Sequence, residues 1–137
     1  WHETGVKSYV FATQLQPMWA TYTYLKEALK YQSPQLVVVE CNHDPDWVAS
    51  SSYPYALKRR ILGDHGHLSN EAGGALARDA VAHGARAVVL AHLSSENNTP
   101  EHARASVERI LFACGALADG VTLGVAPRSE PGPTYAL

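Results

Sequence analysis

The sequence predicts an α/β fold, because strand-like apolar runs alternate along the chain with segments of helical period. Two runs are apolar at every position, Val37-Val38-Val39 and Val88-Val89-Leu90. Strands of a half-solvated antiparallel sheet alternate apolar and polar residues, so these uniform runs indicate strands covered on both faces. Polar residues follow each run directly, at the position where open α/β sheets bind their ligands.

The elements are expected in the order β-α-β-α-α-β-α-β. The predicted strands lie at residues 8–12, 35–40, 85–91 and 121–126. The two longest predicted helices lie at residues 18–31 and 100–117, and two further helices separate the second strand from the third. Three residues of Pro or Gly within residues 128–137 predict an irregular tail.

Two of the helices carry clear signals at their ends. Thr99 can cap a helix that begins at Pro100, a position that needs no amide donor. The residues of this helix expected to face the sheet are Val107, Ile110, Leu111 and Cys114. Either Ser69 or Asn70 can cap the preceding helix, which ends near Gly84. Its apolar stripe consists of Ala72, Ala75, Leu76 and Ala80.

Length and composition bound the class of protein. With 137 residues, 46% of them hydrophobic, the chain is expected to form a single domain over residues 1–137. A formal net charge of -2 argues against a nucleic-acid coat or a polybasic membrane binder, although it leaves a nucleic-acid substrate open. No apolar run approaches the roughly 20 residues of a membrane span, so no membrane partner and a cytoplasmic location are expected.

The cysteines and the first residue add two expectations. Cys41 and Cys114 lack the paired spacing of a zinc knuckle, and they favour a reducing compartment over a disulfide framework. The chain opens on Trp1 and a turn-like Trp-His-Glu-Thr-Gly segment, which indicates a part of a larger fold.

Imidazoles, hydroxyls and amides gather on the loops at residues 64–70 and 91–98. A third polar segment, residues 40–44, follows the strand at 35–40. The carboxyl ends of parallel neighbours meet at one edge, so these segments are expected to form one cleft. Each such residue taken alone is more often a turn or cap residue, but the set favours a functional site.

Four blocks resemble the WalJ/YycJ-like branch of the metallo-β-lactamase-fold hydrolases, in order and in spacing. They are residues 40–44, 53–61, 66–71 and 91–98. Val125-Ala126-Pro127-Arg128 also resembles the closing strand of that branch. The resemblance implies half of a four-layer αββα sandwich, in which two sheets lie between helices and the active site lies at one edge of the sheets.

In that family a two-metal centre is built from an N-terminal His-x-His-x-Asp-His loop, a further His, a bridging Asp and a late His. His92 matches the late ligand, while the N-terminal loop has no counterpart here. Gln14 stands where the bridging Asp is expected, and its neutral amide cannot supply the negative charge that holds two dications together. His2 is a candidate for the middle His of the family. The alignment that places His2 there and the alignment that places Gln14 at the bridging Asp cannot both hold.

The resemblance and the polar blocks supply the remaining site residues. The catalytic candidates are Asp44, His67 and Asn70. The residues expected to hold the surrounding loops are Asn42, His43, Ser69, Ser94 and Asn97. The candidate phosphate contacts are Lys58, Arg59 and Arg60, although a short basic run on a helix is more often a solvated face.

The chemistry implied by the resemblance is hydrolysis of a phosphodiester in nucleic acid by metal-bound hydroxide, with zinc or manganese as the cofactor. His92 with one further ligand from His43, Asp44 or His67 falls short of the three protein ligands of a catalytic zinc. The isolated chain is therefore expected to bind metal weakly or not at all. Activity is then expected only with an N-terminal half in the same or another chain. Half of a sandwich also leaves a sheet face and edge uncovered, which predicts either a homo-oligomer or a complementary N-terminal half as partner.

Two alternatives remain at this point. The first is a degenerate relative without catalysis that keeps the cleft for binding or as a scaffold, which Gln14 and the absent ligand loop favour. The second is a small doubly wound domain that binds a phosphate or a nucleotide, but the chain lacks a Gly-rich fingerprint. Metal content separates the hydrolase from the degenerate relative.

Overall fold

The computed structural model describes residues 18–118 and 120–135, so the predicted strand at 8–12, His2 and Gln14 lie outside the described residues. The helices are α1 (Met18–Leu29), α2 (Pro45–Ser50), α3 (Tyr55–Leu62), α4 (Asn70–Ala82) and α5 (Pro100–Ala113). The strands are β1 (Leu36–Glu40), β2 (Ala87–Ala91) and β3 (Thr122–Val125). The predicted α/β class is confirmed.

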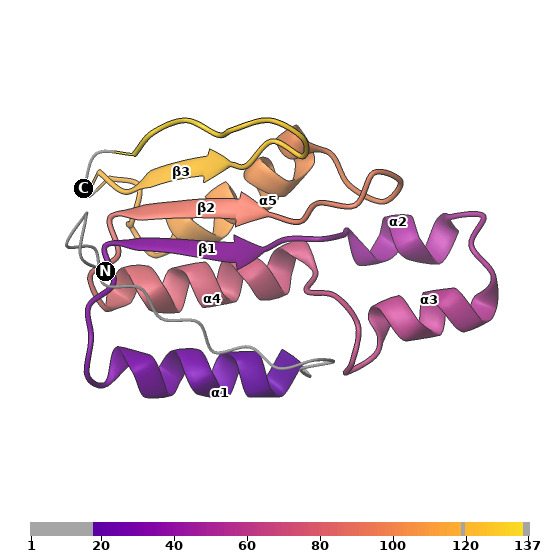
Figure 1. Ribbon diagram of the computed structural model, residues 1–137, viewed down its shortest axis with the longest axis horizontal. Helices are drawn as coiled ribbons and strands as arrows, with labels where there is room; N and C mark the ends of the chain where they lie inside the picture. The colour runs from indigo at the N-terminus through magenta and orange to yellow at the C-terminus, as the bar shows by residue number, and fades with distance from the viewer. Residues whose placement is uncertain (1–17, 119, 136–137) are drawn as a thin grey trace.

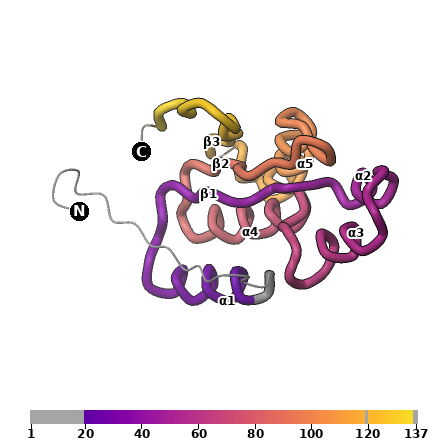
Figure 2. The backbone as a smooth tube through the Cα atoms, turned by 45° about the vertical axis from the view of Figure 1, so that its right-hand side comes forward, coloured from indigo at the N-terminus to yellow at the C-terminus, as the bar shows by residue number. Residues whose placement is uncertain are grey.

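The strands form one parallel sheet in the order β1-β2-β3. Each crossover between neighbouring strands moves in the same direction, and right-handed connections then place their helices on the same face. Accordingly α4 and α5 pack side by side behind the sheet (Figure 1), and α1 lies beside α4 toward the edge formed by β1 (Figure 2). The four-layer sandwich stays a prediction, since the described strands form a single sheet.

The core lies between β2 and the two covering helices. Val88 and Leu90 of β2 are fully buried, and they share a cluster with Val107 and Leu111 of α5. The prediction that Val107 and Leu111 face the sheet is confirmed. The prediction for Cys114 is wrong, because α5 ends at Ala113 and the exposed Cys114 lies at its C-cap.

Coverage on both faces is confirmed for the apolar run of β2 and is wrong for the run of β1. Val89 is buried, and so are its neighbours Val88 and Leu90 on the other face of the strand, because β2 is the central strand. β1 is an edge strand, and the core covers only its face with Val37 and Val39. Val38 points to the other face and remains 62% exposed. An apolar sheet face thus lies open to solvent at this strand.

Three helices separate β1 from β2, where the sequence predicted two. The additional helix is α2, which spans only Pro45–Ser50 and is too short to show a helical period. Asp44 caps it, and Pro45 occupies its first turn. Together α2 and α3 form a hairpin that extends beyond the carboxyl ends of the strands (Figure 1).

The chain after β3 has no regular structure through residue 135. It is tied to the loop after β2, because the Arg128 guanidinium donates to the Ser94 carbonyl at 2.7 Å. Among the helices of residues 18–118 and 120–135, none is long and apolar enough to cross a membrane.

Gly73 allows α4 to approach the end of β1. A β-carbon at this position would collide with the Cys41 sulfur and with the backbone carbonyl of Glu40. A β-carbon at the neighbouring Gly74 would instead collide with the tip of the Ile110 side chain, a flexible group on α5, and would lie at ordinary contact distance from Val107. The two adjacent glycines therefore differ in what a side chain would displace.

We expect Gly73→Ala to lower the free energy of unfolding by about 1–3 kcal/mol, because the Glu40 carbonyl cannot rotate away from the added methyl group. Gly74→Ala serves as the matched control, since Ile110 can change rotamer and alanine favours the helix by up to ~1 kcal/mol. Urea unfolding followed by circular dichroism measures both. Equal stability of the two variants would show that the close approach at Gly73 is unimportant.

Candidate metal centre

Three loops meet at the carboxyl ends of β1 and β2. The Asn42 amide donates to the Leu68 carbonyl at 2.8 Å, which joins the loop after β1 to the loop before α4. The Ser94 amide donates to the Asn42 carbonyl at 2.8 Å, which joins the loop after β2 to the same segment. The polar strand ends therefore come together, as parallel pairing predicts.

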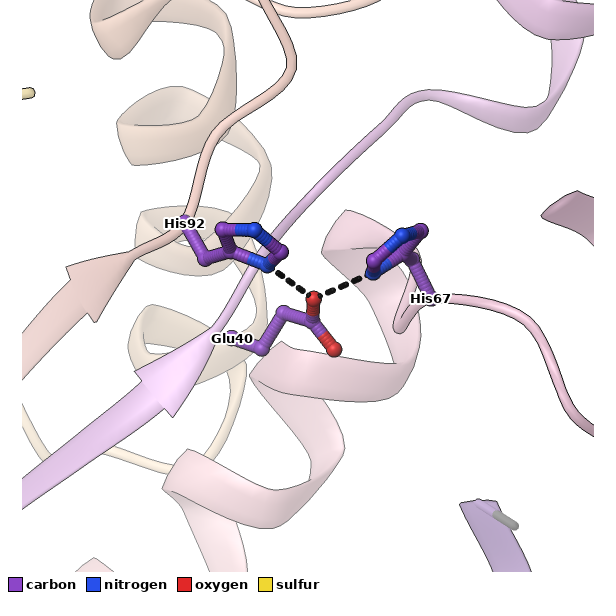
Figure 3. A group of neighbouring side chains, drawn as sticks. All are labelled: Glu40, His67 and His92. Atoms are coloured by element: carbon purple, nitrogen blue, oxygen red, sulfur yellow. Dashed lines mark hydrogen bonds and ion pairs between the residues drawn. The ribbon is translucent and has the colours of Figure 1, made fainter. Parts of the chain in front are cut away.

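Glu40, His67 and His92 converge where these loops meet (Figure 3). Glu40 is the last residue of β1, His67 precedes α4, and His92 follows β2. Nδ1 of His92 lies 2.6 Å from Oε1 of Glu40, and Nδ1 of His67 lies 2.7 Å from the same oxygen. One candidate ligand atom from each side chain lies within 4.8 Å of the other two.

The centre is open to solvent on its imidazole side. The His92 and His67 side chains are 66% and 46% exposed, whereas the Glu40 side chain is 27% exposed. The two rings meet edge to face, with centroids 5.0 Å apart. A cation or a substrate can thus reach the rings from solvent, while the carboxylate supports them from below.

The electrostatics favour an ionised Glu40. Burial alone would raise the pKa of its carboxyl group, but hydrogen bonds from His92, the Leu68 amide and His67 outweigh burial and lower the pKa below its ordinary value. A carboxylate only accepts hydrogen bonds, so each neutral ring carries its proton on Nδ1. Nε2 of each ring then keeps its lone pair, which is the arrangement found in carboxylate–histidine–metal groups.

His92 is held in a strained backbone conformation. Its φ is 59°, and within residues 18–118 and 120–135 it is the single non-glycine residue with a positive φ. Such a conformation costs on the order of 1–3 kcal/mol and persists only where surrounding contacts impose it. The side-chain amide of Asn42 supplies one such contact, since it donates to the His92 carbonyl at 2.7 Å. The loop thus fixes the direction of the His92 ring.

The donor set is that of a transition-metal site. Two imidazoles and one carboxylate provide the three protein ligands of many catalytic zinc centres, and the exposed side leaves a position for water or substrate. A cation can be held through the carboxylate and both rings directly, or through the two Nε2 atoms with Glu40 fixing their tautomers. The geometry gives a candidate ligand group and no metal identity.

Comparison with known proteins points in the same direction. The chain is similar to bacterial exodeoxyribonucleases. It is 42% identical to exodeoxyribonuclease YycJ of Bacillus anthracis over 74 residues, which are 54% of this chain and 28% of the relative. It is 44% identical to exodeoxyribonuclease WalJ of Streptococcus pneumoniae over 64 residues, which are 47% of this chain and 24% of the relative.

The chain spans about a quarter of the length of these YycJ and WalJ relatives. No family model matches the sequence. No solved structure matches it either.

A buried amide pair holds the loops behind the centre. The Asn98 amide nitrogen donates to Oδ1 of Asn70 at 2.8 Å and to the Cys41 carbonyl at 2.9 Å. Asn70, a predicted catalytic residue, is fully buried in this pair and reaches no solvent. The structure thus places it behind the centre, and Asn98 is a loop-holding residue that sequence reasoning missed.

Asp44, also predicted as catalytic, lies outside the triad. Its Oδ1 accepts from the amides of Asp46 at 2.8 Å and Trp47 at 3.2 Å, which caps α2. Its Oδ2 accepts from Nε2 of His102 at 2.7 Å, and the His102 ring stacks on Trp47 at 4.7 Å. The contacts of Asp44 are those of a helix cap, and its catalytic role stays a prediction.

The predicted loop-holding residues lie around the centre. Ser69 caps α4 by accepting from the Ala72 amide at 3.2 Å, so the cap is Ser69 and not Asn70. The Ser94 hydroxyl accepts from the Asn97 amide at 3.1 Å. His43 and Asn97 are buried, and within the described ranges Nδ1 of His43 and Oδ1 of Asn97 have no hydrogen-bond partner.

Glu40 is the ligand candidate that sequence reasoning passed over. Glu40 is the first residue of the block at 40–44, but the site residues predicted in that block were the polar residues after it. The signal lies in strand register, because Glu40 pairs with Ala91 and so stands next to His92. His67, in contrast, was predicted at the site, and Lys58, Arg59 and Arg60 lie apart from it on α3.

Asp44 gives the protein an acid-sensitive element. Burial would raise the pKa of its carboxyl group, but hydrogen bonds from His102 and from the amides of Trp47 and Asp46 outweigh burial and lower it. An unfolded aspartate titrates near ~3.9. Because the folded pKa is lower, the stability from Asp44 is present above about pH 4 and is lost as the pH falls through the folded value.

We therefore expect Asp44→Asn, which keeps a capping oxygen, to lose less stability than the wild type between about pH 4 and pH 2. Asp44→Ala removes the cap as well and should cost about 1 kcal/mol more at neutral pH. Urea unfolding at a series of pH values measures both effects. Parallel pH profiles for the wild type and Asp44→Asn would contradict the assigned ion pair with His102.

Proposed function

We propose that Glu40, His67 and His92 hold a divalent metal ion, zinc or manganese, in an active site that hydrolyses phosphodiester bonds of DNA. The convergence of the three donors at one exposed point carries the proposal. The similarity to proteins named exodeoxyribonucleases supports the substrate class. A bound ion would supply charge neutralisation and an activated water, the two requirements of phosphodiester hydrolysis.

In this proposal, the three side chains hold the ion and orient one another. In the absence of an ion, Oε1 of Glu40 accepts from Nδ1 of both rings and so holds the three side chains around the point where an ion would bind. His67 lies on the flank of the centre opposite His92, and its ring is available either as a ligand or for proton transfer to a leaving oxygen. The backbone contact from Asn42 would hold the His92 ring in place at a bound ion.

Three protein ligands suffice for one ion, whereas a two-ion centre needs more. We propose that further ligands come from residues 1–17, which include His2 and Gln14, or from an N-terminal half on another chain. A cytoplasmic location fits this nuclease role. The degenerate, non-catalytic alternative is less favoured, because a complete set of three donors is assembled and the relatives carry nuclease names.

Metal-dependent nuclease activity tests the proposal. With the chain supplied together with its N-terminal partner segment, we expect end-labelled DNA to be degraded in zinc or manganese and not in EDTA. Glu40→Gln and His92→Ala should reduce the rate at least about 100-fold, since each removes a ligand or its orienting group. Calorimetric titration of each variant with the metal should show the matching loss of affinity.

His83→Ala is the matched control, since His83 is an exposed histidine at the C-cap of α4, and its ring contacts the Asp79 carbonyl on the same helix. It should keep both the metal affinity and the activity. Metal binding and turnover that survive His92→Ala at the wild-type level would refute the assigned centre.

We also propose that the open sheet face at Val38 is covered by a second copy of the chain or by a complementary N-terminal half. Exposed apolar sheet faces and free strand edges favour association. Light scattering of the purified chain should give a mass above the 14.8 kDa of one chain, and Val38→Lys should lower it. A well-folded monomer with native circular dichroism would contradict this association.

A further inference from the structure

The hairpin of α2 and α3 is a basic projection beside the candidate metal centre. Its residues 45–63 contain three basic side chains, Lys58, Arg59 and Arg60, and a single acidic one, Asp46. The whole chain, in contrast, carries a formal net charge of -2. The positive charge lies on α3, which extends past the carboxyl ends of the strands (Figure 1), whereas the acidic Asp44 and Asp64 flank the hairpin.

A groove of about 530 Å³ runs between the two helices. One face of α3 lines it, with side chains spaced three and four residues apart, and Ala49 and Gly63 complete the lining. The residues of that face are Tyr55, Lys58, Arg59 and Leu62. The Tyr55 ring is 76% exposed, so the groove presents an aromatic surface, an aliphatic surface and cations together.

The two cations in the groove have different tasks. Nζ of Lys58 donates to the Ala49 carbonyl at 2.7 Å, which ties α3 to α2 and fixes the width of the groove. The exposed Arg59 guanidinium has no ion-pair or hydrogen-bond partner among residues 18–118 and 120–135. Arg59 is therefore the free cation for a bound anion, and Lys58, predicted as a phosphate contact, supports the groove.

Single-stranded nucleic acid fits this combination. An unpaired base can stack on an exposed aromatic ring, and a planar guanidinium binds phosphate oxygens in pairs. A duplex keeps its bases stacked on one another, so it offers no free base face to the Tyr55 ring. The end of the groove is joined to the loop that carries His67, because the Gly63 carbonyl accepts from the Gly66 amide at 2.8 Å.

We propose that the groove between α2 and α3 binds single-stranded DNA, with a base stacked on Tyr55 and the adjacent phosphate on Arg59, and leads the strand to Glu40, His67 and His92. The choice of DNA rests on the proposed nuclease function. Binding itself requires neither metal nor turnover, so it is measured separately from hydrolysis.

The test is fluorescence anisotropy of a labelled thymidine oligonucleotide with the purified protein in EDTA. Tyr55→Leu should weaken binding about five- to tenfold, the effect of losing one stacked base. Arg59→Gln should reduce the slope of log affinity against log salt by about 0.7, the value for one phosphate contact to a single strand. Duplex DNA, oligouridine and a glutamate-rich peptide are compared under the same conditions.

The matched controls lie at the opposite end of the sheet. Tyr31→Leu changes an equally exposed tyrosine, 79% against 76%, that precedes β1. Arg86→Gln changes an exposed arginine directly before β2. Both variants should bind the oligonucleotide as the wild type does, so that general loss of charge or aromatic surface is distinguished from loss of the groove.

Photo-crosslinking of an oligonucleotide that contains bromodeoxyuridine provides a second measurement, with the adduct expected at Tyr55. Absence of binding, equal effects of Tyr55→Leu and Tyr31→Leu, or an adduct away from the hairpin would overturn the proposal. Equal or tighter binding of duplex, oligouridine or acidic peptide would overturn the assignment to single-stranded DNA. Tyr55-dependent binding without any hydrolysis would support the groove and count against the proposed function alone.

Discussion

The parallel register of β1 and β2 is the constraint on which the candidate centre depends. Glu40 pairs with Ala91, so the carboxylate at the end of β1 stands beside the ring of His92. A slip of one residue would turn Glu40 to the helix-covered face, because side chains alternate between the faces of a strand. The apolar residues Val39 and Leu90, which pair in the same register, lock it by burial on that face. The hydrophobic core therefore sets the geometry of the polar site.

Behind the site, hydrogen bonds of buried asparagine side chains hold the loops in place. The Asn70 and Asn98 side chains bond to each other, and Asn98 also donates to the Cys41 carbonyl, which fixes the loop after β1 against the loops before α4 and after β2. Unpaired amides in such a place would cost about 1–3 kcal/mol each, so the network is stable only when all three loops are in place. This makes loop assembly cooperative and holds the strained His92 backbone.

The sequence predicted what local pattern determines. Thr99 was identified as a cap, and Ser69 as one of two candidates with Asn70, from their position before helical segments. The core positions Val107 and Leu111 were identified from helical spacing. Features that depend on the order of strands in the sheet could not be predicted from local sequence patterns. The exposure of Val38 follows from β1 lying at the sheet edge, and Glu40 becomes a ligand candidate only through its register with a strand some fifty residues away.

Charge links the metal centre to the hairpin. The ionised Glu40 would repel a phosphodiester at short range, because salt largely screens exposed charges only when they are more than about 8–10 Å apart. The same carboxylate that orders both imidazoles therefore opposes substrate until a cation neutralises it. Under the proposed function, Arg59 and Arg60 on α3 would attract a polyanion to the hairpin, although the chain as a whole is acidic. Nucleic acid would thus be retained by the hairpin in either state of the centre, and its scissile phosphate would approach Glu40, His67 and His92 only when the metal is bound.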